Sequence, residues 1–219
     1  MDSFPNPIPL LGLLAIFGLA PFIAVLVSSF VKIVVVMHMI RSALGMRQAP
    51  PNLAVNGIAI ILSMYIMTPV GLQTFDRFQE HDVSITDIQN PGLKAAVVDS
   101  IVPLKKFLDR HSSEEEKLFF SNATKKLWPP EYSELVTKDH LLVLISSFLV
   151  SELTSAFQIG FLVSLPFIVI DLIVANILIS MGMIMVAPIM ISLPFKVLLF
   201  VLIDGWSRLT HGLILSYHQ

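Results

Sequence analysis

The sequence predicts an all-α membrane protein, built from broken helical hairpins with a polar helical insertion between them. Hydrophobic residues make up 55% of the 219-residue chain and charged residues 14%, whereas globular chains average about 25% charged residues. The mean hydropathy is +0.80, too high for a soluble domain that must cover its surface with polar groups. Of the 14 basic and 16 acidic residues, 9 and 12 lie between Asp76 and Asp139.

This segregation of charge divides the chain into three predicted segments. Residues 1–75 form a hydrophobic helical hairpin, residues 76–140 a polar helical segment, and residues 141–219 a hydrophobic hairpin of broken helices. Composition also excludes several functions. The net charge of −2 and the lack of a basic stretch exclude nucleic-acid binding, and the absence of cysteine excludes disulfides and thiolate chemistry.

The first hydrophobic block holds two predicted membrane spans, Ile8–Met39 and Leu53–Phe75, each longer than the roughly 20 residues that a crossing needs. The loop between them carries Arg41 and Arg47 and no acid. A short loop with only positive charge is typical of the cytoplasmic side. We therefore expect the polar segment on the opposite side, the periplasm of a bacterium.

The polar segment is predicted to be helical. Over residues 94–110 the apolar residues recur on one helical stripe, which we expect Pro103 to kink. Ser113 followed by Glu116 has the spacing of a capping box. The helix that it starts is expected to run to Leu127, before Trp128 and two prolines.

The second hydrophobic block runs from residue 141 to about residue 203, too long for two ordinary crossings and barely long enough for three. Prolines and glycines interrupt it at Gly160, Pro166, Gly182, Pro188 and Pro194. At membrane depth such interruptions are tolerated where the backbone is buried in protein or lines a cavity. The pattern therefore predicts broken helices packed within an assembly.

Four charged residues lie within the hydrophobic blocks: Lys32, Glu152, Asp171 and Lys196. A charge at the centre of a span costs about 2.5–3.5 kcal/mol, so it usually faces a partner or water. If the chain folds back midway between Asp171 and Lys196, at residues 183–184, the two lie at similar depth and can pair. The alternative is that each lies near an interface and snorkels to water.

The stretch Met181-Gly182-Met183-Ile184-Met185 holds three methionines at alternate positions. On a helix, Met181 and Met185 share a face and Met183 points away. In an irregular turn all three can project one way and close around cargo of varying shape, because methionine is unbranched and adaptable. Spacing alone favours ordinary packing or lipid-facing methionines.

No catalytic signature is present, and the six histidines are scattered without metal-ligand spacing. We therefore predict neither an enzyme nor a bound metal or cofactor. An intramembrane protease with two aspartates, Asp171 and Asp204, is disfavoured because the flanking residues lack the expected glycine pattern.

Two long stretches resemble a known family: SFLVSELTSAFQIGFLVSLPFIVIDLIVANILISMGMIMVAPIMISLPFKVLLFVLIDGW, residues 147–206, and ALGMRQAPPNLAVNGIAIILSMYIMTPV, residues 43–70. They resemble the FliP/SctR family of type III export-gate proteins, which lie in the bacterial inner membrane in flagellar systems or virulence-type injectisomes. Flagellar members often carry a cleavable signal. The start MDSFPNPIP has no basic region typical of one, so the injectisome branch is favoured.

The resemblance implies a multi-pass, pore-forming subunit at the base of the secretion apparatus. Family members form a homo-oligomer, a pentamer, with FliQ/SctS-like and FliR/SctT-like membrane subunits. The tapered gate exports unfolded polypeptides, and much of it rises above the bilayer plane. In the family a methionine-rich loop seals the closed pore. That loop maps onto Met181, Met183 and Met185, which reverses the interpretation that spacing alone favours. The partners implied are these subunits, secreted polypeptides and membrane lipid.

A small-solute channel or secondary transporter is the alternative function. An inverted repeat would favour a transporter, but the two hydrophobic blocks show no internal similarity. The leading prediction from the sequence is therefore a structural subunit of a protein export gate.

Overall fold

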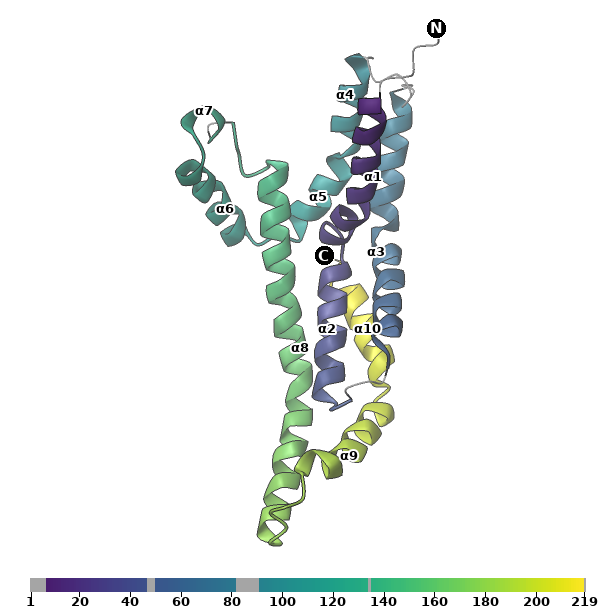
Figure 1. Cartoon of the computed structure of the whole chain (residues 1–219), viewed down its shortest axis with the longest axis vertical. Coiled ribbons are helices and arrows are strands. Elements are labelled where there is room, and N and C mark those ends of the chain that lie inside the picture. Colours follow the sequence, from purple (N-terminus) through teal and green to yellow (C-terminus); the bar gives the residue numbers. More distant parts are fainter. Residues whose placement is uncertain (1–6, 47–49, 82–90, 134, 219) are drawn as a thin grey trace.

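The structure, a computed structural model, describes residues 7–46, 50–81, 91–133 and 135–218, and in these ranges all regular secondary structure is α-helix (Figure 1). The predicted all-α class is confirmed. In chain order the described helices are α1 (Pro7–Leu26), α2 (Phe30–Ala43), α3 (Asn52–Glu80), α4 (Pro91–Ser100), α5 (Val102–Arg110), α6 (Glu114–Leu127), α7 (Pro130–Ser133), α8 (Leu141–Ser180), α9 (Pro188–Leu202) and α10 (Gly205–Leu215).

The long helix α8 runs along the longest direction of the molecule, and α2 packs beside it (Figure 1). On its other side α2 packs against α3. The buried residues of α2 recur at helical spacing; they are Lys32, Ile33, Val36, Met37 and Ile40. The four apolar ones belong to the main hydrophobic core. At 1.5 Å per residue, the 40 residues of α8 extend about 60 Å, roughly twice the thickness of a bilayer's hydrocarbon core.

The first hydrophobic block is bent. The predicted span Ile8–Met39 is not one straight helix, because α1 ends at Leu26 and its C-terminal part meets α2 at an angle of 67°. Two serines lie at the bend: Ser28 Oγ donates to the carbonyl of Val25 at 3.1 Å, and Ser29 Oγ donates to Ser63 Oγ on α3 at 3.1 Å. These hydroxyls supply hydrogen bonds where the helix is interrupted.

The second block differs from the prediction in where it breaks. Gly160 and Pro166 do not interrupt α8, which runs unbroken to Ser180. Gly160 instead allows a close approach, because a Cβ there would lie 2.5 Å from Met39 Sδ of α2. The chain turns after Ser180, and Pro188 then occupies the first turn of α9, where its missing N–H has no helical partner to lose. A second bend, of 60°, separates α9 from α10.

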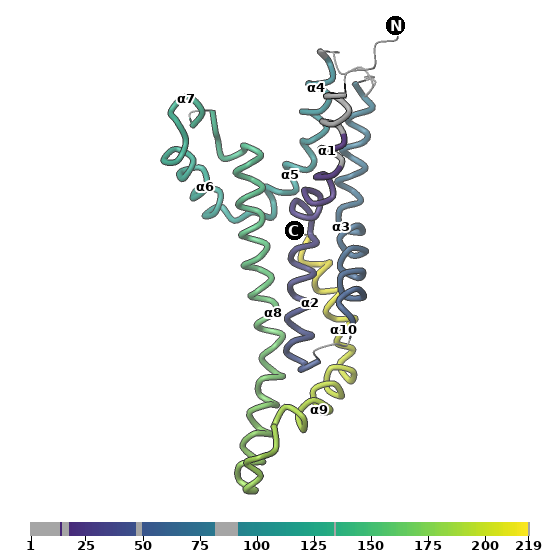
Figure 2. Tube along the Cα trace, in the orientation of Figure 1, coloured from purple at the N-terminus to yellow at the C-terminus, as the bar shows by residue number. Residues whose placement is uncertain are grey.

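The polar segment is helical, as predicted, but the predicted kink at Pro103 is wrong. The break falls at Ile101, and Pro103 lies in the first turn of α5 instead of kinking one helix. The predicted stripe is only partly buried: Phe107 and Leu108 are covered, whereas the side chains at 97 and 98 are exposed. Figure 2 shows α6 and α7 on the side of α8 opposite to α3 and α4.

Two described helices, α3 and α8, are long and apolar enough to cross a membrane, and four spans result if each bent pair counts as one. The bent pairs are the C-terminal part of α1 with α2, and α9 with α10. The chain is therefore an all-α protein with broken helical hairpins, as its composition predicted.

Candidate functional site

The three methionines predicted as a pore constriction lie in the turn between α8 and α9, at the end of the molecule farthest from α4 (Figure 1). Gly182 ends α8 in the left-handed conformation, with φ +73°. The N–H groups of Met183 and Gly182 donate to the carbonyls of Leu178 and Ile179 at 2.9 and 3.0 Å. This pattern is a Schellman cap, which requires a residue free to adopt positive φ.

The turn is irregular, so the helical arrangement of these methionines does not occur. Met181 is 67% exposed, Met183 42% and Met185 100%. All three residues are thus exposed in the single subunit, Met185 completely and Met183 least. Their role as a constriction remains a prediction, since one subunit does not enclose a pore.

Asp171 of α8 and Lys196 of α9 form an ion pair across this hairpin. Lys196 Nζ lies 2.6 Å from Asp171 Oδ2, and Ser192 Oγ donates to Asp171 Oδ1 at 2.6 Å. The predicted pairing is confirmed within one subunit. Snorkelling is wrong for Lys196, whose side chain is 2% exposed, whereas that of Asp171 is 39% exposed.

Lys196 also joins the hairpin to the first block. Its Nζ donates to the carbonyl of Ala43, the last residue of α2, at 3.0 Å. The C-terminal carbonyls of a helix lack intrahelical donors and carry partial negative charge, so an ammonium stabilises them. One cation therefore fixes α8, α9 and the end of α2 relative to one another.

The other two intramembrane charges, Lys32 of α2 and Glu152 of α8, form a second pair. Lys32 Nζ lies 2.9 Å from Glu152 Oε1, and both side chains are almost fully buried. The hydroxyl of Tyr217 donates to Glu152 Oε2, and Lys32 Nζ lies 4.0 Å from the centroid of the Tyr217 ring. The carboxylate and the ammonium are thus both satisfied inside the core.

Tyr217 connects this buried cluster to the polar segment. Its ring stacks on Phe107 with centroids 6.1 Å apart and meets His111 edge-on at 5.0 Å. The pKa of His111 is lowered from 6.5 to about 4, first by burial and then by the positive charges of Lys32 and Arg110. His111 is therefore neutral at pH 7 and packs as an aromatic ring.

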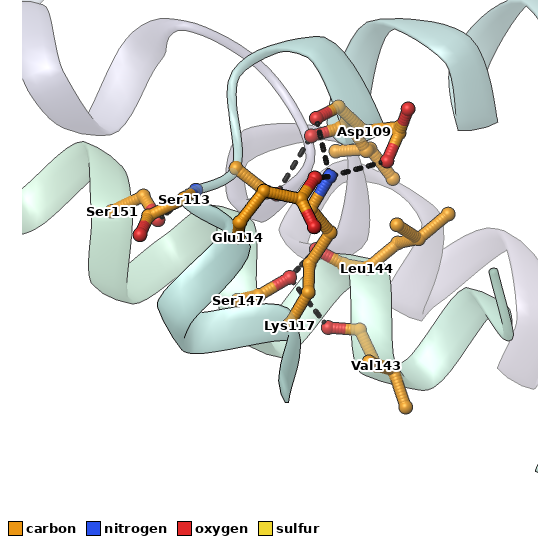
Figure 3. A network of polar contacts seen from close by, with 10 residues as sticks. Asp109, Ser113, Glu114, Lys117, Val143, Leu144, Ser147 and Ser151 are labelled. Atoms are coloured by element: carbon orange, nitrogen blue, oxygen red, sulfur yellow. Dashed lines mark hydrogen bonds and ion pairs between the residues drawn. The ribbon is translucent and has the colours of Figure 1, made fainter. Parts of the chain in front are cut away.

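A second set of polar contacts fixes α6 to α5 and α8 (Figure 3). Lys117 Nζ lies 2.6 Å from Asp109 Oδ1 and also pairs with Glu114. Burial alone would lower the pKa of Lys117, but the hydrogen bonds and charges of these two carboxylates raise it. The Ser113 N–H donates to Ser151 Oγ on α8 at 2.9 Å. The predicted capping box is wrong, because the Ser113 side chain forms no cap.

Much apolar surface of α8 is uncovered by the described chain. Exposed large side chains follow one another along α8 from its middle to its C-terminal part; they include Phe157, Phe161, Leu162, Leu165, Ile168, Val169, Leu172 and Ile173. A patch of this extent marks contact with lipid or protein. Within the described residues, no three His, Asp or Glu side chains gather as metal ligands do.

A family model described as the FliP family matches residues 13–213. The chain belongs to the FliP family. This FliP-family chain is 50% identical to "Yop proteins translocation protein R" of Yersinia pestis, over 99% of both chains. It is 45% identical to "Hypersensitivity response secretion protein HrcR" of Ralstonia nicotianae, over 91% of this chain and 92% of that one. It is 40% identical to "Virulence protein YscR" of Salmonella typhimurium, over 98% and 99%.

Sequence reasoning missed part of this arrangement. It identified Lys32 and Glu152 but gave neither a partner, because 120 positions separate them and no fold-back point is apparent between them. It also missed Tyr217 and His111. Lys32 and Glu152 are a base and an acid in hydrophobic segments, and neither has an opposite charge near it in sequence. This alone could have indicated that the two pair with each other.

Proposed function

We propose that this FliP-family chain is a pore-forming subunit of the protein export gate of a bacterial type III secretion system, and that its methionine turn closes the pore. The observation that carries the proposal is the turn itself. Met181, Met183 and Met185 are exposed at the tip of a hairpin that the subunit holds in place with the Asp171–Lys196 pair.

A ring of such turns has the physical properties that an export gate needs. An idle gate must hold back ions, and an apolar constriction does so by dewetting. An active gate must pass polypeptides of varying sequence, and methionine side chains are flexible enough to repack around them. The chain would contribute position and packing to transport, and no catalysis of its own.

The uncovered apolar face of α8 supports the proposal that the chain assembles with other subunits. Its exposed aromatic and aliphatic side chains need cover from lipid or from other subunits, and α8 is about twice as long as a bilayer core is thick. We propose a homopentamer in the inner membrane, completed by FliQ/SctS-like and FliR/SctT-like subunits. Part of α8 would then be covered by protein beyond the bilayer.

The names of the relatives favour protein as the cargo. One is called a translocation protein of Yop proteins, and the other two carry secretion or virulence in their names. These names favour the injectisome branch over the flagellar one. They also favour polypeptide export over the alternative, a small-solute channel or transporter.

Co-purification tests the proposed assembly. The chain is expressed with both small partner subunits, extracted in mild detergent, and its intact mass is measured. The expected species contains five copies of this chain with the two partners. Expression of the chain without the partners serves as the control for nonspecific aggregation. A species that stays monomeric when both partners are present would contradict the proposal.

A further inference from the structure

A groove of about 320 Å³ lies between α3, α5 and the C-terminal Tyr217. Five of its ten lining residues are apolar, the others include two cations, and none is acidic. Lys106 and Arg110 are four residues apart on α5, so they lie on the same helix face. Gln73 of α3 adds a neutral polar group.

The two cations of the groove have no carboxylate partner in the described chain. The nearest acid in sequence, Asp109, is paired with Lys117. Glu152, which contacts the Tyr217 hydroxyl, is paired with Lys32. The low pKa of His111, about 4, also reflects positive charge here, since Lys32 and Arg110 contribute to it after burial. The groove therefore carries uncompensated positive charge beside a neutral imidazole.

The groove lies where the chain changes from apolar to polar. Its α3 wall begins with Ile66, Pro69 and Val70 and ends at Gln73, three positions before Asp76, the first charged residue of this helix. An apolar wall that leads to paired cations matches the two parts of a membrane lipid, an acyl chain and a phosphate. A cationic pair without an apolar wall would fit any small anion.

We propose that this groove binds a phosphate ester, and that its source is the headgroup of an anionic phospholipid. Lys106 and Arg110 bind the phosphate oxygens, Arg110 with two parallel N–H donors. The apolar residues of α3 contact the start of an acyl chain. The inference does not depend on the proposed export function.

Native mass spectrometry of the full chain in detergent tests this site. Phosphatidylglycerol, phosphatidylcholine and inorganic phosphate are each titrated against the wild type, Lys106→Gln/Arg110→Gln, and a matched control. The control, Lys125→Gln/Lys126→Gln, removes the same charge from exposed positions at the end of α6. A charge-conserving variant, Lys106→Arg/Arg110→Lys, separates loss of charge from disturbance of α5.

We expect one phosphatidylglycerol to bind the wild type, the α6 control and the charge-conserving variant, and the double glutamine variant to bind it roughly tenfold or more weakly. Phosphatidylcholine and inorganic phosphate should compete poorly. Equal retention of phosphatidylglycerol by the glutamine variant would overturn the site. Displacement by millimolar inorganic phosphate would overturn the lipid as its source, and an acidic segment of a neighbouring subunit seated in the groove of the assembled complex would do the same.

Discussion

The two ion pairs of the hydrophobic blocks differ in how far they are removed from solvent. In the Lys32–Glu152 pair, both side chains are at most 5% exposed. In the Asp171–Lys196 pair, only the lysine is buried, and the aspartate is 39% exposed. The first pair lies in the core between α2 and α8, beside Tyr217. The second lies nearer the methionine turn, on the hairpin that carries it.

This difference assigns the two pairs different tasks. A fully desolvated pair is costly to break, because either charge left alone has no access to water. The Lys32–Glu152 pair therefore fixes the packing of α2 on α8. The subunit itself leaves the Asp171 carboxylate 39% uncovered, so water or a polar group of a neighbouring subunit can replace Lys196 there at lower cost. The Asp171–Lys196 pair therefore positions the hairpin yet tolerates adjustment of the turn, as the proposed gating function requires.

The largest effect is expected from Glu152→Ala. It leaves Lys32 buried without its carboxylate, a change that typically costs about 3–5 kcal/mol. We expect the variant to lose thermal stability in detergent and to be recovered poorly from membranes, as measured by size exclusion after heating. Glu115→Ala, at an exposed position of α6, is the control and should match the wild type.

Asp171→Ala also leaves a buried lysine, Lys196, without its carboxylate, but we expect it to cost less than Glu152→Ala, roughly 2 kcal/mol, between the values for exposed and for fully buried pairs. Lys196 keeps the carbonyl of Ala43 as a partner in this variant. Assembly with the partner subunits should be impaired more than by Glu115→Ala, when measured as the yield of intact complex. An effect as large as that of Glu152→Ala would remove the contrast between the two pairs.

The charge swap Asp171→Lys/Lys196→Asp sharpens this test. The two groups are 2.6 Å apart, so the swap restores their attraction while losing the bonds to Ser192 and Ala43. We expect complex yield between those of the wild type and of the single reversals. A swap no better than either single reversal would show that direct pairing contributes nothing to assembly.

Tyr217→Phe removes one hydrogen bond and keeps the ring. Glu152 loses the Tyr217 donor but keeps Lys32, so the expected loss of stability is about 1–3 kcal/mol. The melting temperature of the purified chain measures it. In the Glu152→Ala background the same substitution should have little further effect, because the acceptor is already absent. Additive losses would show that the hydroxyl acts independently of Glu152.

For His111 we predict a smaller effect, on the pH dependence of the stability of the folded chain. Its pKa is about 4 in the folded chain and 6.5 in the unfolded reference. As the pH falls from 6.5 towards 4, the unfolded chain takes up a proton that the folded chain does not, so stability declines. His111→Gln should make the melting temperature less dependent on pH in this window. If the melting temperature of the variant depends on pH as strongly as that of the wild type, groups other than His111 cause the dependence.

Periodicity and hydropathy predict much of the fold, because they report burial that local sequence controls. The start of α8 was predicted closely for this reason. The bounds of α6 were predicted instead from the residues that flank it, Ser113 before the helix and Trp128 with two prolines after it. The uninterrupted α8 was not predicted, since Gly160 leaves room for the side chain of Met39 of α2, a residue remote in sequence, and does not break the helix. The positions of prolines alone also did not predict where helices break. Pro166 lies inside α8, whereas the bend between α1 and α2 falls at two serines.

The candidate site was predictable where the chain folds back on itself. The spacing of Asp171 and Lys196 around residues 183–184 made their pairing one of two predicted outcomes, because a hairpin brings equidistant positions together, and the structure shows the pair. The partner of Lys32 depends on the packing of α2 against α8, which no local pattern encodes. The exposure of the methionine turn likewise depends on where the hairpin ends, which the Gly182 cap determines.

The central claim, that the methionine turn seals the gate, is tested most directly by the permeability of cells to small solutes. Cells expressing the complete gate with Met183→Ala/Met185→Ala are compared with the wild type and with Met64→Ala, an exposed methionine on α3 that serves as the control. Shorter side chains widen an apolar constriction without adding charge, so the double variant should assemble, secrete and leak, and aspartate at both positions should leak more. Unchanged permeability in a fully assembled double variant would place the seal elsewhere and contradict the account.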